Sequence, residues 1–443
     1  MLKIGQVVKG ELSAQTWVVK RKLGEGTQGI VYLVESEMGS KALKWYNDRQ
    51  ATEAQRKSIN ELIMQGAPKG EAGKRFVWPS DIVNNPDSNC FGYIMELINT
   101  SKYAELGDIF AHLKPAPTAF AKCKISENLA HSYQQLHLDG RCYRDISDGN
   151  LMFNPDTGDV LICDNDNVGV EGQSESQVSG TMEYMAPEII IHNTYPSAKT
   201  DLHSLAVLLF RLWIWHHPLE GMFEYDIRCW DLPAKRKVYG ENALFIFDPV
   251  HTENCLPSDP EYDTPRRFWK LCPEPLKRLF TKAFTRGLKN PSERVSETEW
   301  QDVCRELGDC IVLCPHDKAE NYWYEGVGEL KCWHCGKTIE APIRLVLSTN
   351  SGKRYILLTK NARLLERHIN PFANENIRNK VIGEMAQNPN NPMVWGLRNL
   401  TAAPWIMTLA DGTAKEVPPQ RAASISRGVV LNFGHGATGV FEQ

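Results

Sequence analysis

Short apolar runs separated by polar turns dominate the first hundred residues. Residues 17–19 and 31–34 form two such runs, and the glycine-containing segment between them predicts a hairpin of two strands. A third apolar run, at residues 91–98, predicts another strand. Apolar side chains recur at helical spacing within residues 59–63, which indicates a helix with one face against a core.

Two later patterns predict a buried helix and an all-β region. The longest apolar stretch, residues 205–215, is shorter than a bilayer requires and contains Arg211, which favours a buried helix over a membrane span. From residue 344 onward, strand-like runs at residues 344–348, 354–359 and 428–434 alternate with glycine and asparagine turns. This pattern predicts a small β-sandwich.

The segment 143–150 and the residue after the next apolar strand carry the chemistry. Asp145 lies at the start of a loop, Asn150 lies five positions later, and Asp164 directly follows the strand predicted at residues 160–163. An aspartate in the first position can orient a substrate hydroxyl and accept its proton, while an asparagine and a second carboxylate can hold magnesium on a nucleotide. The spacing therefore predicts phosphoryl transfer, with Mg²⁺ or Mn²⁺ on Asn150 and Asp164.

A glycine-rich segment in the N-terminal hairpin resembles the loop that covers ATP in kinases. Gly24, Gly26 and Gly29 would let backbone amides approach the phosphates closely. The hairpin setting differs from the strand-then-helix setting of a dinucleotide fingerprint, and no P-loop lysine follows. Lys44, on the next strand, matches the kinase lysine that holds the α- and β-phosphates, with an ordinary surface lysine as the alternative.

The motifs continue in kinase order toward the C-terminus. Residues 180–188 match the GTxxYxAPE run that closes activation segments, and Asp201 opens a stretch like the central helix of the large lobe, where the aspartate braces the catalytic loop. Arg294 stands where kinases keep the arginine that pairs with the APE glutamate, here Glu188. Over residues 14 to 308 the chain resembles the eukaryotic-type Ser/Thr protein kinases. The resemblance implies a bilobal α+β kinase domain at residues 1–308, with lobes at about 14–98 and 99–308.

The resemblance also implies the remaining nucleotide-binding residues. Lys44 requires an acidic partner from the following helix, for which Glu61 is favoured over Glu53. Met95 would be the gatekeeper. The other residues that would line the ATP site are Val31, Ala42 and Glu96.

Several departures from the kinase pattern fall at the chemistry. Tyr143 replaces the usual histidine and is expected to pack under the metal-binding segment, and Ser147 replaces a lysine that contacts the transferred phosphate. The segment 164–166 reads Asp-Asn-Asp, without the usual phenylalanine and glycine. Asp164 is in register with the kinase metal ligand, so Asp166 is the less favoured ligand.

The activation segment contains candidate regulatory hydroxyls. Thr181 is expected to approach Asp145 and to favour Ser/Thr substrates over Tyr. Phosphorylation is expected on the loop before it, at Ser174, Ser176 and Ser179, because Arg144 next to the catalytic aspartate is commonly neutralised by a loop phosphate. Glutamates in the same loop are the competing way to satisfy that arginine.

A cysteine-histidine cluster predicts a structural zinc site at residues 309–342. The segment containing Cys332 and Cys335 has the spacing of a zinc knuckle, and the segment that begins at Cys314 resembles a second one. Either His316 or Asp317 would be the fourth ligand, and a metal-free pair of packing thiols is the alternative. Cys310 is a further candidate.

The last segment, residues 343–443, resembles a divergent forkhead-associated (FHA) sandwich, with an unrelated sandwich as the alternative. The order of kinase, knuckles and sandwich resembles the bacterial kinase of tellurite-resistance-associated phosphorylation triads. That resemblance would imply a type 2C protein phosphatase and a von Willebrand factor A domain protein as partners.

Composition agrees with a soluble intracellular protein, which we expect to be cytoplasmic. The chain has 443 residues, 42% of them hydrophobic, and a net charge of −4, so it lacks a global basic field for nucleic acid. The N-terminus has no apolar run of signal-peptide length, and no membrane partner is expected. Twelve cysteines without framework spacing fit a reducing compartment.

We therefore expect an ATP- and magnesium-dependent protein Ser/Thr kinase that acts on protein substrates, including itself. The alternative is a nucleotide-binding pseudokinase that acts as a scaffold through its C-terminal modules. A small-molecule kinase is disfavoured because those families lack the APE segment.

Overall fold

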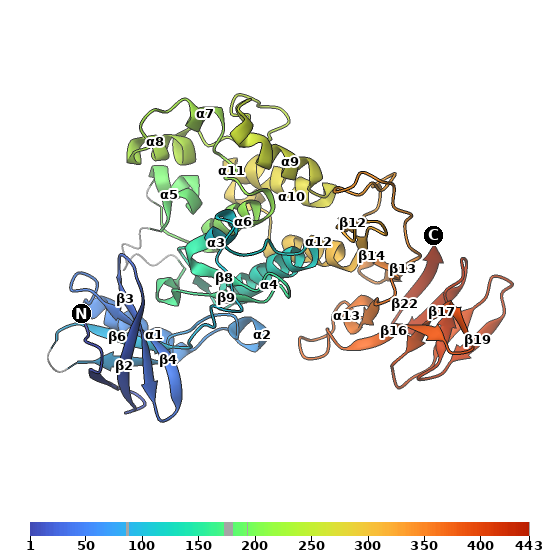
Figure 1. Ribbon diagram of the computed structural model, residues 1–443, viewed down its shortest axis with the longest axis horizontal. Helices are drawn as coiled ribbons and strands as arrows, with labels where there is room; N and C mark the ends of the chain where they lie inside the picture. Colours follow the sequence, from blue (N-terminus) through green and yellow to red (C-terminus); the bar gives the residue numbers. More distant parts are fainter. Residues whose placement is uncertain (86–87, 172–179, 193, 443) are drawn as a thin grey trace. The chain divides into compact units, whose positions relative to one another are not determined.

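The computed structural model describes residues 1–85, 88–171, 180–192 and 194–442. The chain divides into two compact units (Figure 1). One contains residues 1–117 and 124–301, and the other contains residues 118–123 and 302–443.

The N-terminal lobe of the first unit is a closed barrel of six strands. Its core includes Val19, Val34 and Leu43, all with 0% exposure. In β3 the buried and less buried positions alternate, as a strand with one face against a core requires. In barrel order the strands are β1 (Val7–Gly10), β2 (Thr16–Glu25), β3 (Gly29–Ser36), β4 (Gly39–Tyr46), β6 (Phe91–Met95) and β5 (Asp81–Asn84).

Helix α1 (Glu53–Gln65) begins and ends at residues suited to those positions. The Thr52 hydroxyl accepts a hydrogen bond from the Gln55 amide, and the helix ends at Gly66, whose φ is 75°. Ile59 and Leu62 are buried, which confirms a helix with one face against the core. The short α2 (Gly70–Gly73) follows.

The second lobe of this unit is helical, and α6 (Ala198–Ile214) lies in its core. Ser197 and Thr200 form a capping box at its N-terminus, and its side chains from Leu205 to Phe210 are all buried. No helix in the described parts of the chain is long and apolar enough to cross a membrane. The other helices are α3 (Leu106–Phe110), α4 (Ala119–Leu138), α5 (Pro187–His192), α7 (Met222–Tyr225), α8 (Leu232–Arg236), α9 (Asp263–Leu271), α10 (Glu274–Phe284), α11 (Arg286–Lys289) and α12 (Glu297–Asp309).

Two small strand pairs carry the segments with candidate chemistry. β7 (Arg141–Cys142) pairs with β10 (Gly169–Val170), and β8 (Leu151–Phe153) pairs with β9 (Val160–Ile162). The loop that contains Asp145 therefore lies between β7 and β8, while Asp164 directly follows β9 and Cys163.

The second unit contains the predicted β-sandwich. Its two sheets enclose one hydrophobic core that includes Leu345, Leu397 and Trp405. The six-stranded sheet has the order β14 (Gly352–Leu357), β13 (Arg344–Thr349), β22 (Ala437–Glu442), β21 (Val430–Gly434), β18 (Trp405–Thr408) and β19 (Ala414–Val417). The four-stranded sheet has the order β15 (Arg363–Leu365), β16 (Val381–Asn388), β17 (Asn391–Asn399) and β20 (Ala422–Ser424), and the short α13 (Glu366–Ile369) follows β15.

The cysteine-rich segment belongs to the same compact unit as the sandwich. β11 (Ile311–Leu313) pairs with β12 (Glu320–Tyr322), and a small core joins Cys314 and Cys332 to Leu357 of β14. The Trp323 ring contacts Tyr355, with 5.3 Å between the ring centroids. The core of the cysteine-rich segment therefore includes residues from β14, beyond the predicted boundary at residues 342 and 343.

Candidate active site and metal cluster

The carboxylate of Asp145 is held from two sides. One oxygen accepts hydrogen bonds from the Thr181 amide at 2.9 Å and from the Thr181 hydroxyl at 3.1 Å. The Asn150 side-chain amide donates to the other oxygen at 3.1 Å and to the Asp145 carbonyl at 2.8 Å. The predicted approach of Thr181 to Asp145 is confirmed, and the arrangement fixes the carboxylate beside a residue of the activation segment.

The buried Asp201 of α6 braces the backbone of this loop, as predicted. Its oxygens accept the amide of Tyr143 at 2.5 Å and the amide of Arg144 at 3.1 Å. His137 of α4 contacts the same carboxylate at 3.0 Å and also contacts Glu297. Burial alone would lower the pKa of His137, but these two carboxylates outweigh it and raise the pKa to about 9.

Tyr143 connects the catalytic loop to the segment that contains Asp164. Its ring is fully buried, and its hydroxyl donates to the carbonyl of Cys163. Asp164 follows with φ of 48°, in the left-handed region, and its side chain is 40% exposed. Burial raises its pKa, Lys44 opposes that shift, and Asp166 adds to it. The expectation that Tyr143 packs under the segment that contains Asp164 is confirmed.

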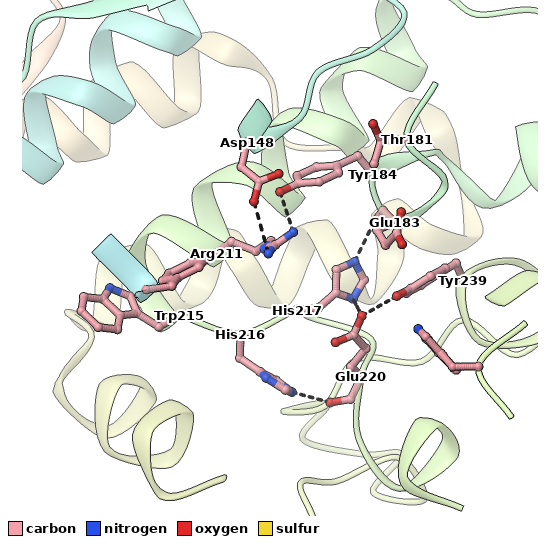
Figure 2. A pocket seen from close by; sticks show the side chains of 12 residues that line it. Asp148, Thr181, Glu183, Tyr184, Arg211, Trp215, His216, His217, Glu220 and Tyr239 are labelled. Atoms are coloured by element: carbon pink, nitrogen blue, oxygen red, sulfur yellow. Dashed lines mark hydrogen bonds and ion pairs between the residues drawn. The ribbon is translucent and has the colours of Figure 1, made fainter. Parts of the chain in front are cut away.

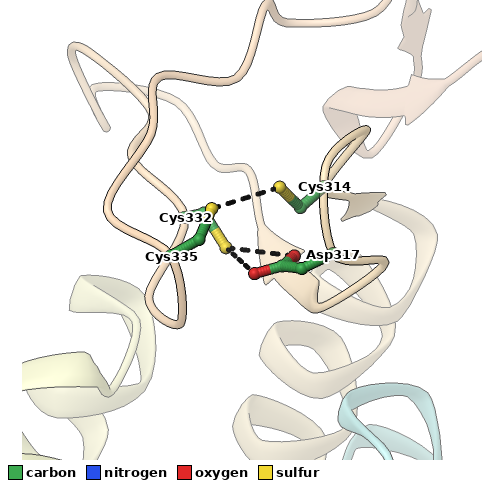
Figure 3. Close-up of side chains that lie close together, drawn as sticks. All are labelled: Cys314, Asp317, Cys332 and Cys335. Carbon is green, nitrogen blue, oxygen red and sulfur yellow. Dashed lines mark hydrogen bonds between the residues drawn. The ribbon is translucent and has the colours of Figure 1, made fainter.

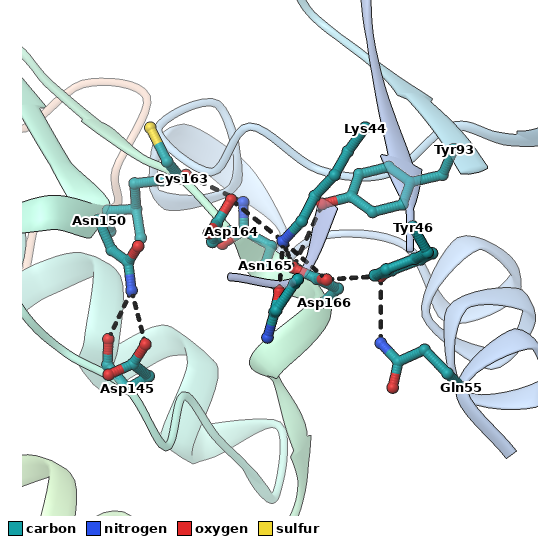
Figure 4. A network of polar contacts seen from close by, with 12 residues as sticks. Lys44, Tyr46, Gln55, Tyr93, Asp145, Asn150, Cys163, Asp164, Asn165 and Asp166 are labelled. Carbon is teal, nitrogen blue, oxygen red and sulfur yellow. Dashed lines mark hydrogen bonds and ion pairs between the residues drawn. The ribbon is translucent and has the colours of Figure 1, made fainter. Parts of the chain in front are cut away.

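Lys44 ends in a buried network of acids and hydroxyls (Figure 4). Its ammonium lies 2.9 and 3.1 Å from the two oxygens of Asp166 and 3.4 Å from Asp164. It also donates to the side-chain carbonyl of Gln28 in the glycine-rich loop at 2.7 Å. Burial lowers the pKa of Lys44, but the carboxylates of Asp166 and Asp164 outweigh it and leave the pKa raised, so the side chain stays charged.

The predicted pairing of Lys44 with Glu61 is wrong in this structure. The ion pair described for Glu61 is with Lys57 of the same helix, at 3.9 Å, and the Glu61 side chain is 57% exposed. The buried face of α1 carries Ile59 and Leu62, so Glu61 points away from the core. Glu53, the alternative, is exposed as well.

Three of the remaining predicted nucleotide-site residues lie on neighbouring strands of the barrel. Val31 is paired with Lys44 across β3 and β4, and Ala42 is paired with Met95 across β4 and β6. β6 ends at Met95, three residues earlier than predicted, and Glu96 lies beyond it in an ion pair with Lys41.

Of the three glycines in the loop, only Gly29 is required by packing. A Cβ atom there would lie 2.1 Å from the carbonyl oxygen of Trp45. Gly24 and Gly26 have open space at the corresponding position, so a side chain would fit there in this structure. Packing therefore does not explain the glycines at those two positions.

The activation segment ends in a buried ion pair. The Arg294 guanidinium donates two hydrogen bonds of 2.8 Å to the carboxylate of Glu188, as the sequence predicted. Such a bidentate pair is both strong and directional. The predicted phosphorylation sites Ser174, Ser176 and Ser179 lie outside the described residues.

The cysteine-rich segment brings four possible metal ligands together (Figure 3). One ligand atom from each of Cys314, Asp317, Cys332 and Cys335 lies within 4.8 Å of all the others. The sulfurs of Cys314 and Cys335 are 3.7 Å apart, and Cys332 lies 3.6 Å from the Asp317 carboxylate. A tetrahedron of ligands at about 2.3 Å from zinc would have edges of roughly 3.8 Å, so the spacing fits that ion.

Two predicted alternatives are absent from this cluster. Asp317, rather than His316, supplies the fourth ligand atom. Cys310 is also outside it, because its thiol donates to the carbonyl of Tyr355 at 3.1 Å. His334, in the knuckle, contacts the Asp317 carboxylate at 2.9 Å and orients it.

Comparison with known families decides what the first unit is. The model of the protein kinase domain matches residues 17–302, which is more than half of the chain. The chain belongs to the protein kinase family. The two-lobed architecture and the order of its motifs agree with that assignment.

The relatives of this kinase include serine/threonine-protein kinases. Protein kinase gsk3 of Schizosaccharomyces pombe is 23% identical over 62% of this chain and 67% of its own length. Serine/threonine-protein kinase SCH9 of Saccharomyces cerevisiae is 25% identical over 47% of this chain and 25% of its own length. The chain thus spans two thirds of one relative and a quarter of the other. The expectation of a protein Ser/Thr kinase is confirmed at the level of the family.

A solved structure is similar to part of this chain. The PknI kinase domain of Mycobacterium tuberculosis, in a mutant form, has 18% identity and a TM-score of 0.44. The match covers 69% of this chain and 98% of the mycobacterial chain.

A cavity of about 600 Å³ lies beside Thr181, the residue that contacts Asp145 (Figure 2). Thr181 and Asp148 are in its wall, together with aromatic side chains that include Trp215. Arg211 donates to the Tyr184 hydroxyl at 2.7 Å and forms an ion pair with Asp148 at 3.2 Å. The cavity therefore offers aromatic surface and a cation that is already paired.

Sequence reasoning missed the residues that surround Lys44 on its buried side. Tyr46 is two positions after Lys44 on the same strand, and Tyr93 is paired with Lys44 across β4 and β6. Positions two apart share a face of a strand, so a search for hydroxyls on the Lys44 face could have found Tyr46. No local pattern in the sequence indicated the contact between Asp166 and Lys44, because the two residues are 122 positions apart.

Proposed function

We propose that this kinase transfers the γ-phosphoryl group of ATP to serine or threonine hydroxyls of protein substrates, itself included, in bacterial signalling. Asp145 orients the acceptor hydroxyl and accepts its proton. Asn150 and Asp164 hold Mg²⁺ or Mn²⁺ on the nucleotide, and Lys44 holds its phosphates. When the metal ion is bound, it would neutralise part of the negative charge on the phosphates.

The observation that carries the proposal is the position of Asp145 between Asn150 and Thr181. A general base must lie within hydrogen-bond reach of the acceptor, and a fixed carboxylate loses less entropy when the acceptor binds. Thr181, which contacts Asp145 at 3.1 Å, would narrow the space for the acceptor and so favour a short hydroxyl side chain. The cavity that adjoins Thr181 supports an approach of the substrate chain from that side.

The experiment separates nucleotide binding from phosphoryl transfer. Asp145→Asn keeps the size of the side chain but removes the base, so transfer to a generic protein substrate should fall at least about 100-fold. Binding of a fluorescent ATP analogue should change little, since Asp145 contacts the acceptor rather than the phosphates. Asp156→Asn, at an exposed position in the β8–β9 turn of the same lobe, is the matched control. A scaffold without transferase activity would give the same low transfer in all three proteins.

For the cysteine cluster we propose one structural zinc ion, held by Cys314, Asp317, Cys332 and Cys335. The donor set of three sulfurs and one carboxylate suits zinc. The amide of His334 donates to the Cys332 sulfur at 3.4 Å, which stabilises a thiolate at that position. A structural zinc site requires only its ligands, so these residues are sufficient for that role and no additional acid or base is needed.

For the C-terminal sandwich we propose an FHA-like module, on the strength of the strand pattern and of two sheets with six and four strands. The resemblance of the whole chain to the triad kinase is the basis for two proposed partners, a type 2C protein phosphatase and a von Willebrand factor A domain protein. If the phosphatase is a partner, it should remove phosphate from the autophosphorylated chain.

A further inference from the structure

Lys44 is a buried cation, and its partners determine where it can hold a nucleotide. Its side chain is only 5% exposed. A buried charge that loses its partner destabilises its surroundings by several kcal/mol, so some carboxylate must stay with it. Two carboxylates approach it: Asp166 with both oxygens, at 2.9 and 3.1 Å, and Asp164 at 3.4 Å.

The Asp166 side chain has 0% exposure and is fixed on several sides. Its carboxylate accepts hydrogen bonds from the hydroxyls of Tyr46 and Tyr93, in addition to those from Lys44 (Figure 4). Gln55 of α1 donates in turn to the Tyr46 hydroxyl at 3.1 Å. An ionised carboxylate has about four acceptor positions, and these donors occupy them. Asp166 is therefore committed to this network, with little capacity left for a metal ion.

Helix α1 contributes an amide to this network in place of an acid. Gln55 lies on the same face as the buried Ile59 and Leu62, while Glu53 and Glu61 are exposed. Helix α1 contacts the network through the hydrogen bond from Gln55 to the Tyr46 hydroxyl, and that hydroxyl in turn donates to Asp166. An acid on α1 is thus unnecessary for neutralising Lys44.

We propose that Asp166 is the positioning residue for Lys44 and replaces the helix carboxylate in that role. This proposal rests on the proposed function of Lys44 in binding the phosphates of ATP. The segments that hold Lys44 are the glycine-rich loop, through Gln28, strands β4 and β6, and the single turn at Asn165–Asn167, which directly follows Asp164. The position of Lys44 is then set by the same turn that carries the metal ligand. A displacement of α1 alone would leave the ion pair intact.

The first test compares Asp166→Asn with Glu61→Gln, by the KM for ATP and by kcat. Asp166→Asn keeps the shape but leaves Lys44 without its closest counter-ion, so the KM for ATP should rise at least tenfold. Glu61→Gln should stay within twofold of the unmodified protein. Asp166→Glu, which restores the charge, should recover part of the loss. A loss in Glu61→Gln as large as that in Asp166→Asn would overturn the proposal.

The second test asks whether Asp166 acts through Lys44. Lys44→Met should itself raise the KM for ATP, and adding Asp166→Asn to it should cause little further change, because contacting residues give non-additive effects. A full additional loss in the double variant would show a role independent of Lys44 and would reject the inference. If Lys44→Met alone has no effect, the proposed function of Lys44 fails instead.

A third variant guards against misfolding of the Asp166 substitutions. Tyr46→Phe removes one hydroxyl that holds Asp166 and leaves the ring in place. It should raise the KM for ATP by a smaller factor than Asp166→Asn does, because only one of the hydrogen bonds that hold the Asp166 carboxylate is lost. An unchanged KM in Tyr46→Phe and in Asp166→Asn together would contradict the positioning role.

Discussion

Two carboxylates two positions apart have different surroundings. The Asp164 side chain is 40% exposed and has one described ion pair, with Lys44 at 3.4 Å. The Asp166 side chain has 0% exposure, and its oxygens accept four hydrogen bonds. A metal ligand needs a free lone pair that faces the nucleotide, whereas a counter-ion needs burial and fixed donors. The geometry therefore assigns the two acids to different roles.

This division predicts different magnesium dependences for the two acids. Asp164→Ala should raise the magnesium concentration that gives half-maximal phosphoryl transfer by at least tenfold, since a ligand is lost. Asp166→Asn should leave that concentration within about threefold while the KM for ATP rises. A magnesium titration at saturating ATP measures both. Equal shifts in the two variants, or a larger one in Asp166→Asn, would move the metal ligand to Asp166.

At the scale of elements, His137 joins three helices of the kinase lobe. It lies near the end of α4, and it contacts Asp201 in α6 and Glu297 at the start of α12. Asp201 also accepts the backbone amides of the catalytic loop. A charged His137 therefore stabilises the helix that braces the loop.

This histidine makes the stability depend on pH in a defined direction. Its pKa is about 9 in the folded protein and about 6.5 when unfolded. The folded state binds the proton more tightly, so the stabilisation is complete below pH 6.5 and is lost as pH rises through 9. The difference amounts to up to about 3 kcal/mol.

Urea unfolding at pH 7 and pH 10 tests this prediction, with His137→Gln as the comparison. The free energy of unfolding should fall more steeply with pH in the unmodified protein than in the variant. Other groups that titrate in this range are common to both proteins and cancel. The same fall in both would show that His137 is not the group responsible.

The cysteine cluster predicts a metal-dependent element in the second unit. Protein purified without chelator should contain about one zinc ion per chain, and a Cys332→Ser, Cys335→Ser double variant should contain none and unfold at lower temperature, because metal binding is coupled to folding at such sites. His316→Ala should keep the metal, since His316 is outside the cluster. Elemental analysis together with thermal unfolding measures this. Wild-type protein without zinc would reject the site.

At the scale of the whole molecule, partners that belong to a known motif pattern were predictable, and partners that depend on packing alone were not. The pairs Asp145 with Asn150 and Glu188 with Arg294 follow from fixed positions in a known pattern, and the sandwich follows from period-two strands. The partner of Lys44 depends instead on which face of α1 is turned inward and on the turn after β9. Both depend on packing. Helix α1 contains two plausible acids, Glu53 and Glu61, but no local pattern in the sequence shows which way their side chains point.

The second unit shows the same limit. The spacing of Cys314, Cys332 and Cys335 predicted a cluster, but the choice between adjacent His316 and Asp317 depends on the direction of each side chain in the turn. The joining of the knuckle core to β14 through Leu357 depends on tertiary contacts that no local pattern encodes. The core of the cysteine-rich segment therefore extends past the predicted boundary at residues 342 and 343.

The measurement that tests the central claim most directly is phosphoamino-acid analysis after incubation with γ-labelled ATP, magnesium and a generic protein substrate. The account predicts label on phosphoserine and phosphothreonine with the unmodified protein and with Asp156→Asn, and almost none with Asp145→Asn. Label confined to phosphotyrosine would contradict the substrate class. Transfer by the unmodified protein no greater than that by Asp145→Asn would contradict the assignment of a catalytic Asp145 and favour a scaffold.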